Sequence, residues 1–310
     1  MKIVRIRSKT GGHLGLILMV LTVFGVCSKG FPAGEIADEQ ELQEWLANYE
    51  WLHAVDKASR TSRAGRLEEA IEEYRSAVEL AETEEQKAET LLHMGQVYEA
   101  LSREETIKTY RRILDECPAS GLVPQVCFRL GELHRSISLV PEMESEECRR
   151  VVEEEMIPAR SIPFFEKGVA SGKPLERYVL FSRSYLANLY HETGREEEAW
   201  GILHELASLS LVDVQAPVFA GSFTQRILPQ ESRLREAKDA AEKARASARR
   251  RLIAWSVDAS DPTGSIARIE SVAQRYPDEE TILMAEKEVE RLRAALAQDL
   301  REDIERIPKE

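Results

Sequence analysis

The residue types most able to do chemistry are present in this chain, but none stands in a catalytic or metal-binding arrangement. The six histidines are spread along the sequence, and no H-E-x-x-H pair exists that would hold zinc on one helical face. No G-x-S-x-G nucleophile motif and no P-loop lysine occurs either. Carboxylates are numerous, as on any helical surface. The sequence therefore predicts no catalytic residue, no metal and no cofactor, and it does not indicate an enzyme.

Three cysteines follow the N-terminal segment, namely Cys117, Cys127 and Cys148. Cys117 and Cys127 bracket one interhelical turn, and an oxidising compartment would permit a disulfide between them. Because three is an odd number, at least one thiol then stays free or pairs between chains. The alternative is that all three are small buried hydrophobic residues in helix contacts. The sequence leaves both interpretations open.

The first thirty residues differ in kind from the rest. Four basic residues between Lys2 and Lys9 precede an uncharged apolar run from Leu14 to Val26. This pattern is typical of a secretory signal peptide. As a helix, the run would span about 20 Å, which is short of the roughly 30 Å hydrocarbon core of a bilayer. We therefore expect residues 1–28 to be a cleaved signal peptide and the protein to be exported, either periplasmic or associated with the cell envelope.

Two alternatives to simple cleavage would associate the N-terminus with a membrane. The apolar run could stay as an uncleaved anchor. In addition, Cys27 stands at the end of the run, where lipoproteins carry their acylated cysteine. The preceding Phe24-Gly25-Val26 departs from a good lipobox. The sequence therefore favours an unmodified Cys27 at the end of a cleaved signal peptide over a lipidated one.

The charge balance argues against nucleic acid as a partner. The chain has 55 acidic and 42 basic residues, for a net charge of −13. Binding to phosphates requires clustered Lys and Arg. Here the basic residues are interspersed with acidic ones along predicted helices, as on a solvated helical surface.

One pattern recurs: a small residue, a bulky residue four positions later, and a packing residue three beyond that. Four copies begin at Ala70, Thr106, Ser161 and Ala199, at intervals of 36, 55 and 38 residues, and a weaker fifth begins at Ser265. A small residue lets two helix backbones approach, and its bulky neighbours fill the surrounding space. Helix pairs of this kind in series are the unit of a helical solenoid.

The helices that precede three of these copies carry small residues of their own. These are Gly95, Gly131 and Ala187, each followed three residues later by an aromatic residue or histidine. Together the two patterns resemble the tetratricopeptide repeat (TPR), whose period is about 34 residues. The resemblance implies an all-α, right-handed solenoid with a long C-terminal helical segment. It also implies a binding scaffold rather than a catalyst.

The predicted organisation follows from these patterns. We assign the TPR-like repeats to residues 35–211, with an acidic insertion near 137–158, and a linker loop to residues 212–230. Residues 231–310 hold a degenerate repeat and a helix that would cap the solenoid. Alanines at steps of three and four near the start of this last segment suit packing on the solenoid or a separate coiled coil, and self-association stays open.

In the TPR family the first helix of each repeat lines a concave face, so the resemblance implies a binding groove. Aromatic and amide side chains on rigid helices suit a peptide or partner protein. The predicted groove positions are His93, Gln96, Glu99, Phe128, Arg129, Glu132, Arg135, Phe181, Tyr185, Asn188 and His191. The alternative is that they form an ordinary solvated face.

A second functional hypothesis also survives. The segment from Cys117-Pro118 to Leu130-Gly131 and the later Tyr276-Pro277-Asp278 resemble repeat junctions of outer-membrane assembly lipoproteins. Those proteins are exported repeat solenoids that act as structural subunits. A lipidated Cys27 would favour this hypothesis.

Overall fold

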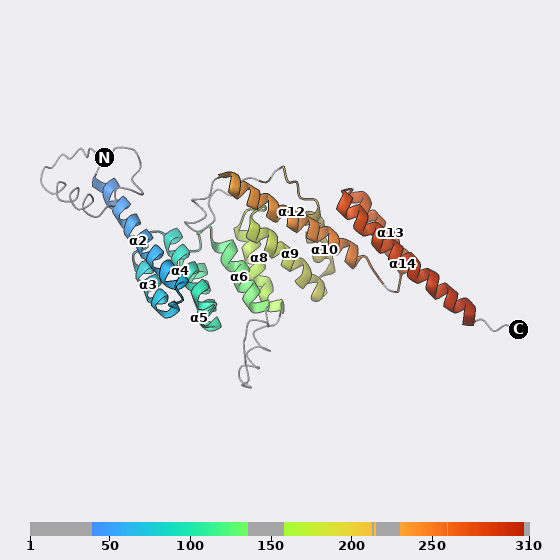
Figure 1. Cartoon of the computed structure of the whole chain (residues 1–310), viewed down its shortest axis with the longest axis horizontal. Helices are drawn as coiled ribbons and strands as arrows, with labels where there is room; N and C mark the ends of the chain where they lie inside the picture. The colour runs from blue at the N-terminus through green and yellow to red at the C-terminus, as the bar shows by residue number, and fades with distance from the viewer. Residues whose placement is uncertain (1–38, 136–157, 213, 215–229, 259, 307–310) are drawn as a thin grey trace, which may run out of the picture. The chain divides into compact units, whose positions relative to one another are not determined.

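The computed structural model describes residues 39–135, 158–212, 214, 230–258 and 260–306 (Figure 1). All regular secondary structure in these ranges is helical, which confirms the all-α prediction for them. The chain divides into two compact units, residues 1–101 and residues 102–310. Outside the described residues lie the predicted signal peptide with Cys27, nearly all of the insertion with Cys148, and most of the linker.

The first unit contains three described helices. They are α2 (Glu39–Arg63), α3 (Leu67–Glu79) and α4 (Glu84–Tyr98). Helix α3 packs on both others, and α2 also contacts α4. In the interior, Trp51 of α2 donates an indole hydrogen bond of 2.9 Å to the Thr90 hydroxyl of α4. Helix α4 begins with a capping box, in which Thr83 and Gln86 each accept a backbone N–H of the other.

The second unit repeats one contact scheme. Its described elements are α5 (Arg103–Glu116), α6 (Val123–Arg135), the 3₁₀ helix η2 (Pro158–Ser161), α8 (Ile162–Ser171), α9 (Arg177–Glu192), α10 (Glu196–Ala207), α12 (Gln230–Trp255), α13 (Pro262–Arg275) and α14 (Glu279–Arg306). In the trio α6, α8 and α9, every helix contacts the other two. The same holds for α9, α10 and α12, and again for α12, α13 and α14. Adjacent packed pairs of this kind are the arrangement of a helical repeat.

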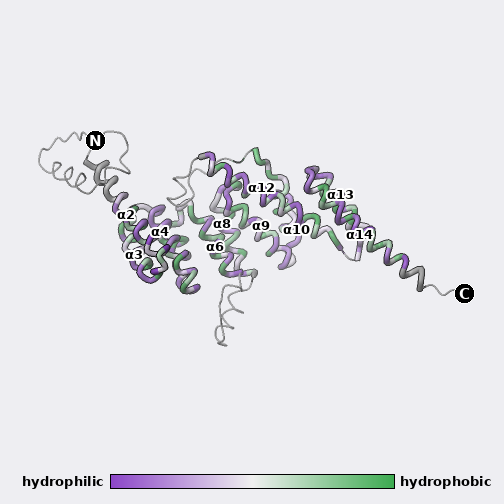
Figure 2. The backbone as a smooth tube through the Cα atoms, viewed as in Figure 1, coloured by the Kyte–Doolittle hydropathy of each residue, from purple (hydrophilic) through white to green (hydrophobic). Residues whose placement is uncertain are grey.

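The residues of the recurrent sequence pattern are buried in the cores of both units. Its small residue is 0 % exposed in all five copies, at Ala70, Thr106, Ser161, Ala199 and Ser265. The bulky residues four positions later, from Tyr74 to Ile269, are also buried. Figure 2 shows hydrophobic and hydrophilic residues alternating along the helices, as expected when one face of each is buried. The repeat pattern found in the sequence therefore marks the packed side of each helix.

The α6–α8 pair is in close contact at Gly131. A Cβ atom at this position would lie 2.5 Å from the Cζ atom of Phe165, a residue that is itself fully buried. On the other helix, a Cβ at Gly168 would lie 3.0 Å from the Cβ of Cys127. A side chain at Gly131 would therefore have to displace the buried Phe165 ring.

Two further glycines serve the turns between paired helices. Gly65 follows α2 and Gly194 follows α9, and both have φ near 79°, the left-handed region that favours glycine. After each, the next backbone N–H returns to a carbonyl five residues earlier, from Arg66 to Thr61 and from Arg195 to Tyr190. This is the helix-ending geometry of a Schellman motif.

The C-terminal helices continue the stack. Alanines of α12, including Ala241 and Ala248, share one buried cluster with Leu203 of α10 and Ile269 of α13. Residues 230–306 therefore pack on the preceding repeats and are not a separate coiled coil. Helix α14 runs on past α13 (Figure 1), and on its far part Leu300 is 62 % exposed, so the expected cap covers the stack only in part.

Arg249 joins three elements of this region. Its Nε donates to the Ala207 carbonyl at 3.0 Å, and its Nη1 pairs with Asp278 just before α14. Asp278 also accepts hydrogen bonds from the Thr281 backbone N–H at 3.1 Å and hydroxyl at 2.7 Å. Burial alone would raise the pKa of Asp278, but the Thr281 hydrogen bonds and the Arg249 charge outweigh it and lower the pKa. The ionised carboxylate thus holds the start of α14 against α12.

We predict that Gly131→Ala lowers the free energy of unfolding by about 1–3 kcal/mol, because the new methyl group must displace a buried ring. Gly201→Ala is the matched control, since Gly201 is also helical but has nothing within 4 Å of its Cβ position. There the change should be neutral or stabilising by up to about 1 kcal/mol. Urea denaturation of both variants measures the difference. Equal effects of the two substitutions would contradict close helix contact at Gly131.

We predict that Asp278→Asn destabilises the protein by about 0.5–1 kcal/mol at pH 7, a small effect because Asp278 is 42 % exposed and water screens its charge. The folded-state pKa lies below the unfolded value of about 3.9. The contribution of the charge is therefore present above that value and is lost as pH falls through the folded-state pKa. Urea denaturation of both proteins between pH 7 and about pH 3 should show the two stabilities converging, and a constant gap would refute this role.

Candidate functional site

The structure brings predicted groove residues of the third and fourth repeats into contact. The Tyr185 hydroxyl of α9 donates to Glu132 of α6 at 3.4 Å, and the Arg135 guanidinium lies 4.4 Å from the centre of the Tyr185 ring. Arg129 and Asn188 are partly exposed on the same two helices. Helices α6 and α9 thus contact each other through some of the predicted side chains, and their role in binding stays a prediction.

An aromatic cluster underlies this surface. The buried Phe128 of α6 has four other rings with centroids within 6.0 Å of its own. They are Phe165 of α8 and Tyr178, Phe181 and Tyr185 of α9. The three α9 rings are partly exposed. Packing against Phe128 fixes their positions while leaving part of each ring accessible.

Helix α12 extends the surface with two residues that the sequence reasoning missed. The Trp255 ring stacks on His191 with centroids 4.0 Å apart, and Arg251 donates from Nη1 to the Ser184 carbonyl at 2.9 Å. The sequence feature that could have identified them is the spacing of Arg251 and Trp255, one helical turn apart in a segment that is otherwise rich in alanine. We call this surface the arginine–aromatic face. It consists of Arg129, Glu132, Arg135, Arg177, Tyr178, Phe181, Tyr185, Asn188, His191, Arg251 and Trp255.

The set of residues that forms the arginine–aromatic face contains four arginines and one glutamate, although the whole chain has a net charge of −13. Two of its arginines lie over rings: Arg135 over Tyr185, and Arg177 over Phe181 at 5.4 Å. A guanidinium over a ring keeps hydrogen-bond donors available at its edge. On α5, by contrast, Lys108 is paired with Glu104 and Glu105, as on an ordinary helical surface. The face can therefore offer rings and cationic donors together.

The remaining predicted groove residues, His93, Gln96 and Glu99, lie in the first unit. His93 stacks on Tyr74, and its Nδ1 lies 3.3 Å from the Gln96 side-chain oxygen. Burial lowers the pKa of His93, which keeps the ring neutral at pH 7. Glu99 is exposed directly after α4. The ring of His93 is thus engaged in packing, and Glu99 is the more accessible of the three.

The described residues hold no group of three or more His, Cys, Asp or Glu that could bind a metal ion. Across the same ranges, no helix is long and apolar enough to cross a membrane. In comparisons with known proteins, no protein-family model matches the chain and no curated protein matches its sequence significantly. The relationship to TPR proteins therefore stays a prediction.

Cys117 and Cys127 form no disulfide, and both are fully buried. Burial raises the pKa of the Cys127 thiol to about 11, which disfavours the thiolate that reacts with electrophiles. For these two residues, the structure supports buried hydrophobic packing rather than a disulfide between them.

We predict that a variant with Cys27→Ser and Cys148→Ser has two thiols that do not react with a disulfide reagent in the native protein at about pH 8, because both are fully buried. Adding denaturant should release two equivalents of reactive thiol, as measured by absorbance. The same variant with Ser76→Cys is the control, since Ser76 is exposed and its cysteine should react at once. Two silent thiols even in denaturant would instead indicate a disulfide.

Proposed function

We propose that this protein is an exported, TPR-like scaffold that binds a protein or peptide partner on its arginine–aromatic face. Support for a repeat of the TPR type comes from the contact scheme shared by successive helix trios and from the burial of the small residue in all five copies. In this proposal the stack is right-handed, and residues 1–28 direct the chain to the periplasm or cell envelope. The protein then acts by binding rather than by catalysis.

The observation that carries the proposal is the arrangement around Tyr185. Its ring is fixed by Phe128 below, its hydroxyl by Glu132, and Arg135 lies over it, yet the side chain stays partly exposed. A rigid, partly exposed aromatic ring loses little conformational entropy on binding and can act as an anchor. Arginines beside it supply donors for carbonyl and carboxylate groups. This chemistry suits a polypeptide segment with apolar anchors and acidic residues.

An ordinary solvated face is the competing explanation for the same residues. Solvated helical surfaces in this protein carry ion pairs within one helix, such as Arg112 with Glu116 at 2.8 Å and Arg66 with Glu69 at 2.8 Å. Ion pairs between helices also occur on exposed surfaces, such as Arg293 with Glu270 at 3.1 Å. On the arginine–aromatic face, Arg135 instead lies over a ring and Arg251 donates to a backbone carbonyl, and neither pairs with a carboxylate among the described residues. That difference favours a built surface over a solvated one.

We predict that a photo-crosslinking amino acid at Asn188 captures one discrete partner in cells. Asn188 lies one turn beyond Tyr185 on α9 and is partly exposed. Mass spectrometry of the adduct then identifies the partner. Adding Tyr185→Ala to the same chain should reduce the adduct by about tenfold, the loss typical of an anchor residue.

The control places the same amino acid at Glu197, which is exposed on α10. An adduct from Asn188 alone supports binding at the arginine–aromatic face. Equal adducts from both positions, or none from either, would contradict the proposed site. An Asn188 adduct unaffected by Tyr185→Ala would remove Tyr185 as the anchor.

A further inference from the structure

A pocket of about 390 Å³ opens among α10, the end of α12 and α13. Trp200 and His204 line it from α10, Ser256 from the end of α12, and Arg268, Ser271 and Arg275 from α13. Among the described residues, two arginines and no carboxylate line this pocket, although acidic residues outnumber basic ones in the chain. The volume falls within the range of small-molecule sites, roughly 300–1,000 Å³.

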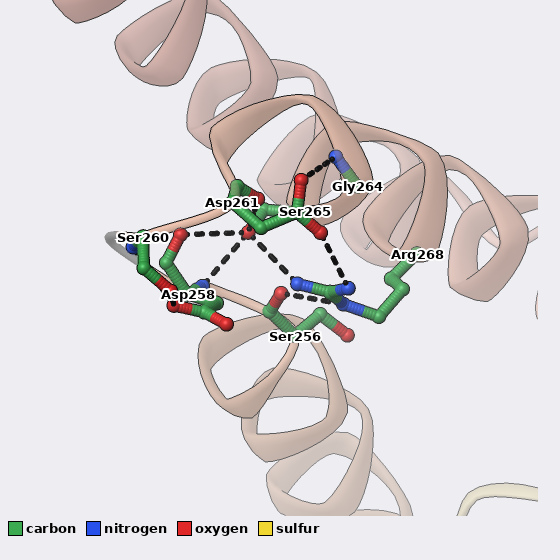
Figure 3. A network of polar contacts seen from close by, with 7 residues as sticks. All are labelled: Ser256, Asp258, Ser260, Asp261, Gly264, Ser265 and Arg268. Atoms are coloured by element: carbon green, nitrogen blue, oxygen red, sulfur yellow. Dashed lines mark hydrogen bonds and ion pairs between the residues drawn. The ribbon is translucent and has the colours of Figure 1, made fainter.

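The first arginine is held in place by the turn between α12 and α13. Figure 3 shows Arg268 within a polar network, where its Nε donates to the Ser256 carbonyl and its Nη2 to the Ser265 hydroxyl, both at 3.1 Å. Its Nη1 pairs with Asp261 at 3.2 Å. Asp261 also caps α13 by accepting the Gly264 N–H at 2.9 Å. The Arg268 charge is therefore fixed in position and partly balanced.

The second arginine is different. Arg275 lies seven residues after Arg268, so it is on the same side of α13 about two turns further on. Within the described residues Arg275 makes no hydrogen bond and no ion pair, whereas Arg249 and Arg293 each pair with a carboxylate. Its guanidinium lies 5.8 Å from the centre of the Tyr276 ring, and within the described part of the chain no carboxylate balances its charge at the pocket.

The other walls are apolar or neutral. The Trp200 ring meets the Trp255 ring edge-on, with centroids 6.1 Å apart, and Val272 is buried beside the pocket. His204 is joined through Nδ1 to the Tyr276 hydroxyl at 2.8 Å. Burial, with a smaller effect of the Arg275 charge, lowers the pKa of His204 and keeps its ring neutral at pH 7. The unbalanced charge at the pocket thus comes from arginine.

We propose that this pocket binds a carboxylate attached to an apolar group of about ring size, with the carboxylate at Arg275 and the apolar group against Trp200. A guanidinium donates two parallel hydrogen bonds to a carboxylate, and Ser271 adds a hydroxyl at the same wall. A planar group can stack on the indole ring. The carboxylate can belong to a free organic acid or to the carboxyl end of a polypeptide. The proposal does not depend on partner binding at the arginine–aromatic face, although Trp255 of that face contacts the pocket residue Trp200.

Phenylacetate is the first probe, and phenylacetamide is its uncharged counterpart. Titration of each into the full chain is followed by NMR, using the indole N–H signal of Trp200, which is assigned from its absence in Trp200→Phe. We expect saturable shifts with phenylacetate and at least tenfold weaker binding of the amide. Arg275→Gln should weaken phenylacetate binding by about tenfold, the loss typical of one charged hydrogen-bonding group. Arg275 is exposed, so this variant should keep its native circular dichroism spectrum.

The control variant is Arg291→Gln, which removes an exposed arginine paired with Glu288 on α14 and should leave binding unchanged. A peptide ending in phenylalanine, with a free or an amidated carboxyl end, separates the two sources of carboxylate. Tighter binding of the free-ended peptide than of phenylacetate indicates a polypeptide end, and the reverse order indicates a free acid. The proposal is overturned by equal binding of acid and amide, by an unchanged affinity in Arg275→Gln, or by no saturable shift up to about 10 mM of any probe.

Discussion

The rest of the structure depends on how closely paired helices approach each other at small residues. At Gly131 the ring of Phe165 occupies the space where a Cβ would lie, and at Ala187 and Ala199 the two alanines of the next pair are fully buried. Because contact at these positions is so close, the pair has little freedom to rotate or slide. The first helix of each pair therefore presents a fixed set of residues on the side that faces away from the second helix.

Because the helices are held in this orientation, arginine side chains of the second unit have two different roles. Arg249 and Arg251 on α12 reach backbone carbonyls of α10 and α9, where their long side chains tie neighbouring helices together. Arg135 instead lies over the Tyr185 ring, and Arg275 has no carboxylate partner among the described residues. The first use explains how α12 attaches to the preceding pair. The second leaves positive charge where a ligand could meet it, which is unusual for so acidic a chain.

Much of the fold could be read from the sequence, because its signals are local. Small-residue spacing identified the buried face of each pair. Helix boundaries are harder to read from the sequence, since α6 begins at Val123 and includes Pro124 in its first turn. Proline is tolerated there because that N–H has no helical partner in any case.

The candidate site was harder to predict because its contacts are distant in sequence. Glu132 and Tyr185 are 53 residues apart, and only the resemblance to a repeat family suggested that they share a face. Nothing in the local pattern around Trp255 revealed that its ring would stack on His191. The same holds for the pocket, since Trp200 and Arg275 come from helices on either side of the linker.

The connection between the two helices of a pair varies greatly in length along this chain. Between α9 and α10 it is the short turn Thr193–Arg195, whereas residues 136–157 separate α6 from η2, and both pairs pack in the same way. Loop-closure entropy grows only with the logarithm of the number of residues between two packed helices, so a longer connection in general lowers stability only slightly. The turn between paired helices is therefore the place where such a protein can acquire new sequence during evolution while its stack is preserved.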